Sequence, residues 1–227
     1  DVASYAGLPA CGYRISGDPE KLFEKSDIVI DFTLPAATSA HLAFAQQYKT
    51  NLILGTTGHT EKELNDIENA AKNITIVKAM NFSIGVNALF SLTESLSGIL
   101  DTSFDIEVLE MHHKHKVDAP SGTAIALGEA AAKGRSANLE DLSVRGRDGI
   151  SSPRKKGDIG FASLRGGEVV GDHTIIFAGE SERIELTHKA ASRGIFSQGA
   201  VFAALWTDGK LPGLYNMQDV LGLSKSV

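Results

Sequence analysis

The segment that decides the fold is Asp27-Ile-Val-Ile-Asp-Phe-Thr-Leu-Pro-Ala-Ala-Thr38. Its first half is a short apolar run rich in β-branched residues, and this length suits a buried strand better than a helix. Pro35 then falls at the first turn of a run of good helix formers that reaches about Tyr48. We therefore predict a buried parallel strand followed by a helix.

The same order of strand and helix occurs twice more along the chain. Residues 52–54 predict a second strand, and Thr60 with Glu63 forms a capping box at the start of the next helix. Residues 74–77 predict a third strand, which leads into a helix at about 86–100. Strands that alternate with helices indicate βαβ units and a parallel sheet covered on both faces. This part of the chain is therefore predicted to be half of a doubly wound α/β domain.

The pattern changes after residue 103. Four segments with few helices between them read as strands: 104–111, 160–164, 168–177 and 183–188. One long helix is predicted at about 121–133, and residues 145–157 form a polar loop with five basic side chains. We expect a second α+β domain, in which a mixed sheet has one face covered by that helix.

Composition sets limits on the class of protein. The chain has 227 residues, 42% of them hydrophobic and 22% charged, and no run of 18 apolar residues, which excludes a membrane span. With 28 acidic and 22 basic side chains the net charge is −6, which argues against nucleic-acid or membrane partners. The single cysteine, Cys11, fits a reducing compartment, so we expect a cytoplasmic protein. The chain starts at Asp1 and not at methionine, so we expect the natural start to lie upstream.

The densest cluster of reactive side chains is Glu110-Met-His-His-Lys-His-Lys-Val-Asp-Ala-Pro-Ser-Gly-Thr-Ala124. A solvated basic loop is one interpretation of its three histidines and two lysines. The other is an anion site, because Ser121, Gly122 and Thr123 would open a helix whose free amides and dipole attract negative charge. Ser121 can also serve as the N-cap of this helix.

A metal site is an alternative use of the same block. His112, His115 and Asp118 could be ligands. Lys114 and Lys116 would oppose a divalent cation and favour a carboxylate or phosphate, so we expect an anion site and no metal.

Three short loops follow the predicted parallel strands. They are Asp31-Phe-Thr33, Gly55-Thr-Thr-Gly58 and Asn81-Phe-Ser-Ile-Gly85. Each alone could be a turn, and the chain has no G-x-G-x-x-G or P-loop motif. Together they lie at the carboxyl edge of one sheet, where open α/β folds bind nucleotides.

These motifs carry a resemblance to a known family. The E-x-H-H-x-x-K-x-D-A-P-S-G-T-A block, GTTG, NFSIGVN and the HKA-x-S-R stretch at 188–193 resemble the 4-hydroxy-tetrahydrodipicolinate reductase (dihydrodipicolinate reductase) family, over about residues 27–223. The resemblance implies a Rossmann-like dinucleotide-binding domain at residues 1–83, completed by 194–227, and a substrate-binding and tetramerisation domain at 84–193. The family's Gly-rich pyrophosphate loop has no counterpart in this chain, so the first domain is expected to lack its N-terminal part.

The resemblance also implies roles for particular residues. His112 and Lys116 would be the catalytic pair, with Lys116 the proton donor. The substrate carboxylates would be held by His113, Lys116, Ser121, Gly122 and Thr123. The cofactor, NADH or NADPH, would be held by Gly55, Thr56, Thr57, Ala79, Met80, Asn81, Phe82 and Arg193.

The implied reaction is hydride transfer to the C=N bond of a cyclic dicarboxylate, formed from 4-hydroxy-tetrahydrodipicolinate by loss of water, in lysine and diaminopimelate biosynthesis. A homotetramer is the implied assembly. Three alternatives stay open at this stage: another amino-acid-pathway dehydrogenase, a non-catalytic oligomer that binds a nucleotide or dicarboxylate, and a metal-dependent hydrolase.

Overall fold

The computed structural model describes residues 1–150 and 152–223 and divides into two compact units. The first comprises Asp1–Met80 and Ala203–Tyr215, and the second Asn81–Phe202 and the chain from Asn216 onward. The predicted limits are at 83/84 and 193/194, whereas the units meet at 80/81, 202/203 and 215/216. Helix α8 (Gly194–Trp206) contributes residues to both units. Its first part packs within the second unit, where a Cβ on Gly199 would lie 1.7 Å from the carbonyl oxygen of Phe82.

The first unit contains a four-stranded parallel sheet in the order β1-β2-β3-β9. Its strands are β1 (Ile28–Asp31), β2 (Asn51–Leu54), β3 (Thr75–Lys78) and β9 (Gly213–Tyr215). Helices α3 (Pro35–Tyr48) and α4 (Glu61–Ala70) follow β1 and β2, and the capping box of Thr60 and Glu63 is present. The predicted βαβ order is confirmed, and apolar side chains of these strands and helices form one core.

The second unit contains a five-stranded mixed sheet in the order β5-β6-β4-β7-β8. Its strands are β4 (Asp105–His112), β5 (Ser143–Arg145), β6 (Ile159–Arg165), β7 (Asp172–Ala178) and β8 (Arg183–Lys189). Strand β4 pairs in parallel with β6 and antiparallel with β7. The predicted mixed sheet is therefore confirmed, although residue 168 lies in a turn with Gly167 and β7 begins only at Asp172.

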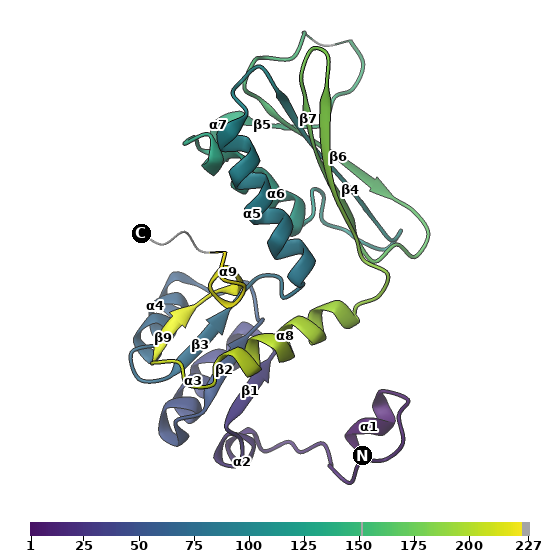
Figure 1. The fold of residues 1–227 in the computed structure, drawn as a ribbon. Coiled ribbons are helices and arrows are strands. Elements are labelled where there is room, and N and C mark those ends of the chain that lie inside the picture. Colours follow the sequence, from purple (N-terminus) through teal and green to yellow (C-terminus); the bar gives the residue numbers. More distant parts are fainter. Residues whose placement is uncertain (151, 224–227) are drawn as a thin grey trace. The chain divides into compact units, whose positions relative to one another are not determined.

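Two helices, not one, cover this sheet. Helices α5 (Ile84–Ile99) and α6 (Gly122–Gly134) lie side by side, and both supply side chains to the core of the second unit (Figure 1). Their close approach depends on small residues, since the Ser97 hydroxyl donates a 2.7 Å hydrogen bond to the Ala131 carbonyl oxygen. A Cβ on Gly134 would lie 2.2 Å from the Glu94 carbonyl oxygen.

Several short elements were not predicted. They are α1 (Val2–Tyr5), α2 (Pro19–Glu24), α7 (Leu139–Leu142), α9 (Met217–Val220) and the strands β5 and β9. In α2, Asp18 is the N-cap and Pro19 is the first residue of the helix. Proline disrupts the interior of a helix but is tolerated in its first turn, and Pro19 occupies that position here.

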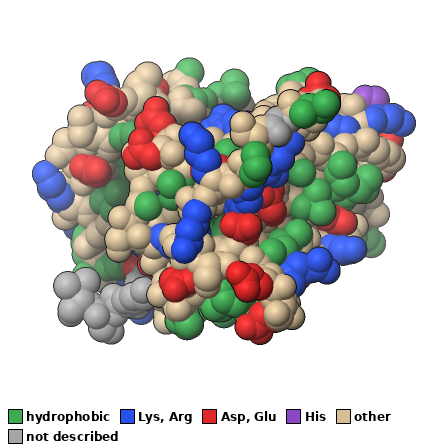
Figure 2. Space-filling model, turned by 90° about the horizontal axis from the view of Figure 1, so that it is seen from above, with side chains coloured by type: hydrophobic (Ala, Val, Ile, Leu, Met, Phe, Trp, Pro, Cys, Tyr) green, Lys and Arg blue, Asp and Glu red, His purple; other side chains and the backbone are tan. Residues whose placement is uncertain are grey.

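The surface carries both signs of charge. On the face shown in Figure 2, lysine and arginine side chains are interspersed with aspartate and glutamate, and hydrophobic groups lie between them. Within the described part of the chain, no helix combines the length and apolarity that crossing a bilayer requires.

Candidate active site

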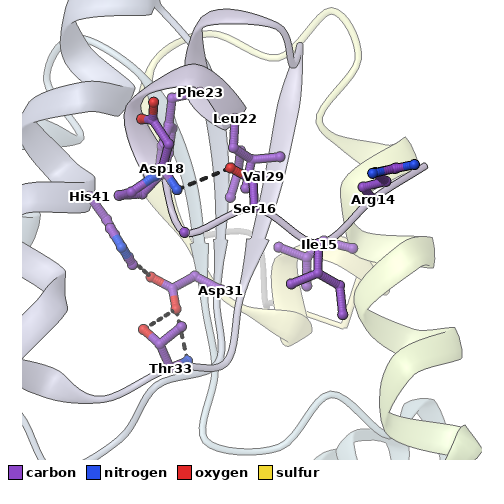
Figure 3. A pocket seen from close by; sticks show the side chains of 13 residues that line it. Arg14, Ile15, Ser16, Asp18, Leu22, Phe23, Val29, Asp31, Thr33 and His41 are labelled. Atoms are coloured by element: carbon purple, nitrogen blue, oxygen red, sulfur yellow. Dashed lines mark hydrogen bonds and ion pairs between the residues drawn. The ribbon is translucent and has the colours of Figure 1, made fainter. Parts of the chain in front are cut away.

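The carboxyl ends of β1, β2 and β3 lie at one edge of the first sheet, because the three strands are parallel and in register. Asp31, the last residue of β1, is buried and is the centre of a polar cluster (Figure 3). It accepts hydrogen bonds from the Thr33 backbone N–H at 2.9 Å and the Thr33 hydroxyl at 2.7 Å. His41 Nδ1 lies 2.7 Å and Thr56 Oγ1 lies 3.3 Å from its carboxylate oxygens. Asp31 therefore fixes the loops after both β1 and β2.

The ionisation of Asp31 follows from these contacts. Burial alone would raise its pKa, but the hydrogen bonds from Thr33 and His41 outweigh burial, and the pKa lies below its usual value. Because the carboxylate is an acceptor only, His41 Nδ1 is the donor in their hydrogen bond.

A cavity of about 420 Å³ lies beside the edge of β1, between this strand and the segment that precedes α2 (Figure 3). Asp31, Thr33 and His41 contribute to its wall. The histidine and lysine block at 112–116 does not line this cavity.

In the loop after β2, the main chain at Gly55 lies close to the Phe32 ring. A Cβ on Gly55 would lie 2.3 Å from the Phe32 ring, so only glycine fits here without moving that ring. Thr56 is buried through its contact with Asp31, whereas Thr57 is exposed. After β3, Ala79 is half-buried and Met80 is exposed. A glycine loop with exposed neighbours at the carboxyl edge of a parallel sheet fits a dinucleotide cofactor.

The other predicted cofactor residues belong to the second unit. Asn81 accepts a hydrogen bond from the Ser83 N–H at 2.8 Å and donates one to Thr123 Oγ1 at 3.2 Å. The Phe82 side chain is 1% exposed and is a core residue, so this position can offer a ligand only its main chain. Arg193 is exposed in the bend before α8.

The reactive block of the second unit is organised by one buried carboxylate. Glu110, on the core-facing side of β4, is 1% exposed. Its oxygens lie 2.6 Å from His112 Nδ1 and accept the Ser121 backbone N–H at 3.2 Å. The Arg165 guanidinium donates to both oxygens, at 2.8 and 2.9 Å. The carboxylate therefore joins the end of β4 to the start of α6.

Glu110 is charged in this setting. Burial would raise its pKa, but hydrogen bonds from Arg165, His112 and Ser163 outweigh burial and hold the pKa below its usual value. An ionised carboxylate only accepts, so His112 carries a proton on Nδ1.

Ser121 is the N-cap of α6. Its hydroxyl accepts the Ala124 N–H at 3.2 Å, while its own N–H is taken by Glu110. The N–H groups of Gly122 and Thr123 have no hydrogen-bond partner among the described residues. They are therefore the two free amides at the positive end of the helix dipole.

Lys116 and His113 lie in the loop between β4 and α6. The Lys116 ammonium is 2.8 Å from a carboxylate oxygen of Asp118, and its side chain is 21% exposed. His113 is half-buried, and His115 is exposed. No three His, Cys, Asp or Glu side chains in the described ranges are arranged to hold a metal ion.

Sequence reasoning missed three partners of the predicted site: Glu110, Arg165 and His173. A signal for Glu110 was present, because residues two apart on a strand point to the same face, and His112 is two residues further on. Arg165 and His173 lie on other strands and reach the site only through the pairing of β6 and β7 with β4.

The first unit has the parallel sheet typical of dinucleotide-binding domains, and the second has a mixed sheet with a polar site at a helix start. This combination is typical of two-domain NAD(P)-dependent oxidoreductases. Two family models match the chain: "Dihydrodipicolinate reductase, N-terminus" over residues 1–82 and "Dihydrodipicolinate reductase, C-terminus" over residues 85–221. The chain belongs to the dihydrodipicolinate reductase family. The predicted family, fold class and cofactors, NADH or NADPH, are thereby confirmed.

Individual relatives agree with the family models. A 4-hydroxy-tetrahydrodipicolinate reductase of Rhodopseudomonas palustris strain BisB5 is 53% identical over 225 residues, which cover 99% of this chain and 83% of the relative. A 4-hydroxy-tetrahydrodipicolinate reductase of Dinoroseobacter shibae is 52% identical over 223 residues, which cover 98% of this chain and 83% of the relative. A solved structure, dipicolinate-bound dihydrodipicolinate reductase from Paenisporosarcina sp. TG-14, has a TM-score of 0.71 at 25% identity and covers 95% of this chain and 82% of its own.

Proposed function

We propose how the residues of this chain divide the work of the family's activity, the NAD(P)H-dependent reduction of 4-hydroxy-tetrahydrodipicolinate in lysine biosynthesis. The observation that carries the proposal is that His112 and the start of α6 are both hydrogen-bonded to Glu110. This arrangement supports an imidazole held in a fixed position relative to two free backbone amides. Glu110 thus holds a proton-exchanging imidazole and an anion-binding helix start in a fixed relation to each other. This arrangement suits a substrate that carries carboxylates beside the atom to be protonated.

The substrate that fits is the cyclic C=N dicarboxylate formed by loss of water. One carboxylate would lie on the Gly122 and Thr123 amides, where the helix dipole favours an anion. His113 and Lys116 would neutralise the remaining negative charge. Ser121 supports this site as the N-cap, since its amide and hydroxyl are already engaged. The dipicolinate bound by the solved relative supports this substrate class.

The chemistry requires a hydride and a proton. Bound NADH or NADPH supplies the hydride, and Gly55, Thr56, Thr57, Ala79, Met80, Asn81, Phe82 and Arg193 are proposed to hold it. Lys116 would give a proton to the ring nitrogen, and His112 would act with it as the catalytic pair. The protein's contribution is to position the ring, neutralise its carboxylates and supply that proton, which yields tetrahydrodipicolinate.

The assembly proposed is a homotetramer. The face of the mixed sheet opposite α5 and α6 carries Leu109, Met111 and Leu164, none of which is buried. Apolar side chains on a sheet face favour contact with a second copy. A cytoplasmic location stays a prediction from the single cysteine.

The test is turnover of purified protein, followed by loss of reduced nicotinamide in the presence of freshly generated substrate. We expect oxidation that depends on the dicarboxylate and persists with a chelator. Binding of dipicolinate without turnover would favour a non-catalytic oligomer, and loss of activity with the chelator would favour a metal-dependent enzyme. Light scattering measures the number of copies in the assembly.

A further inference from the structure

The Glu110–Arg165 ion pair contacts three segments that carry the proposed substrate site: His112, the backbone of Ser121 and the backbone of Asp118. Glu110 is hydrogen-bonded to His112 and to the backbone of Ser121. Arg165 donates to both oxygens of Glu110 and also to the Asp118 carbonyl oxygen, at 2.6 Å. Asp118 in turn holds the Lys116 ammonium at 2.8 Å. The imidazole, the helix start and the lysine loop are thus all attached to one pair of side chains.

The position of Glu110 is unusual for a group that only stabilises a sheet. The residues of β4 that share its face are Ile106, Val108 and His112, and the first two are fully buried in the apolar core. Glu110 is buried whereas the Arg165 side chain is 21% exposed. An ion pair with a buried member is a poor source of stability, because the cost of removing charge from water offsets much of the attraction. A bidentate guanidinium–carboxylate contact does, however, fix direction more tightly than apolar packing can.

The effect on His112 is specific. A carboxylate at 2.6 Å from Nδ1 requires a proton there, which leaves Nε2 as the nitrogen that exchanges protons. The Gly171 backbone approaches the other end of the ring closely, since a Cβ on Gly171 would lie 3.0 Å from His112 Nε2. Tautomer and orientation are therefore both restricted.

We propose that Glu110, held by Arg165, is the positioning residue of the reductase: it selects the Nδ1–H form of His112 and fixes the start of α6 and the Lys116 loop relative to it. This inference rests on the proposed roles of His112 and Lys116. It assigns Glu110 no contact with substrate or cofactor.

The variant that tests it is Glu110→Gln, which keeps the size of the side chain and removes its charge. In histidine-15N-labelled protein, we expect the His112 ring, identified among the seven histidines by its absence from the spectrum of His112→Asn, to lose its strict Nδ1–H form. We expect kcat to fall about tenfold or more, as when a histidine loses the carboxylate that orients it, while KM for NADH stays within about twofold.

The matched control is Glu107→Gln on the same strand. Glu107 also forms a bidentate pair with an arginine, Arg147, at 2.9 and 3.0 Å, but it points to the opposite face of the sheet. A merely structural role for Glu110 predicts similar losses in both variants, whereas positioning predicts a loss of kcat and a tautomer change in Glu110→Gln alone.

The outcomes are distinguishable. Wild-type kcat and an unchanged Nδ1–H signal in Glu110→Gln would overturn the inference. An inactive wild-type protein would count against the proposed function, while the tautomer measurement would still decide what Glu110 does to His112. If Glu110→Gln does not fold, Arg165→Lys decides, because lysine keeps the charge and loses the two-point contact. A clear fall in its kcat supports positioning, and wild-type kcat overturns it.

Discussion

The Nε2 atom of His173 lies 3.1 Å from the hydroxyl oxygen of Ser121, the residue that caps α6. His173 is 4% exposed, and its ring stands edge-on to that of His112, with 5.0 Å between centroids. Burial, with a smaller contribution from the charge of His112, lowers the pKa of His173 from 6.5 to about 4. The ring is therefore neutral at pH 7 and unfavourable to protonate while the chain is folded.

The first prediction concerns stability between pH 7 and pH 4.5. In this range the unfolded chain protonates His173 and the folded chain does not, so stability falls as the pH falls. At about 1.4 kcal/mol for each unit, His173 contributes up to about 3 kcal/mol to this loss. In His173→Gln, which cannot titrate, urea unfolding at a series of pH values should show a shallower dependence. An unchanged dependence would show that folding does not lower the pKa of His173.

The second prediction concerns Lys116. We expect Lys116→Ala to lower kcat by roughly 10²- to 10⁴-fold, the usual worth of a general acid, and to leave cofactor affinity nearly unchanged. Steady-state kinetics and a calorimetric titration with NADH measure the two effects. Among the described residues, the ion-pair partner of the ammonium is the exposed Asp118 carboxylate, so we expect the variant to fold. A variant that keeps more than about half of the wild-type turnover would remove Lys116 from the proton-donor role.

The third prediction concerns the free amides of α6. Gly122→Ala places a methyl group at the amide proposed to bind a carboxylate, and nothing lies within 4 Å of that Cβ in the folded chain. We expect KM for the dicarboxylate to rise about tenfold or more, since a hydrogen bond to a charged group is worth about 1.5–3 kcal/mol. Thr123→Val removes a hydroxyl that can donate a hydrogen bond to the substrate carboxylate, so KM should rise in this variant too. The same substitution removes the hydrogen bond that Thr123 Oγ1 accepts from Asn81. Unchanged KM in both variants would leave the helix start with a capping role only.

The fourth prediction concerns the contact between α5 and α6. In Gly134→Ala the new methyl group would meet the Glu94 carbonyl oxygen and Ser97 Cβ, at 2.2 and 2.9 Å. Because backbone must move to relieve this contact, we expect a loss of about 1–3 kcal/mol in the free energy of unfolding. Gly122→Ala, in the same helix but with open space around it, is the control and should unfold at nearly the wild-type denaturant concentration. Equal stability of the two variants would contradict the close helix contact.

Local sequence patterns were sufficient to predict the βαβ part of the fold. The capping box of Thr60 and Glu63 and the apolar runs near residues 28–31 and 74–77 are local signals. The apolar run of β3 is largely buried, whereas β1 lies at the edge of the sheet and leaves Ile30 41% exposed, so the prediction that β1 is fully buried was wrong. The family motifs likewise identified the reductase family and its cofactors, because they reside in contiguous stretches. Short edge elements such as β9, with three residues, have no such pattern and form only when a neighbouring strand provides hydrogen-bond partners.

The environment of the reactive block was decided by the tertiary structure alone. Strand alternation places Glu110 and His112 on one face, but register sets what they meet: Glu110 is opposite His173 on β7, and His112 is opposite Arg165 on β6. A shift of one residue in either pairing would turn these partners to the other face of the sheet. The paired residues are more than 50 positions apart in the chain, so their register depends on how whole strands pack together, and no local stretch of sequence carries that information.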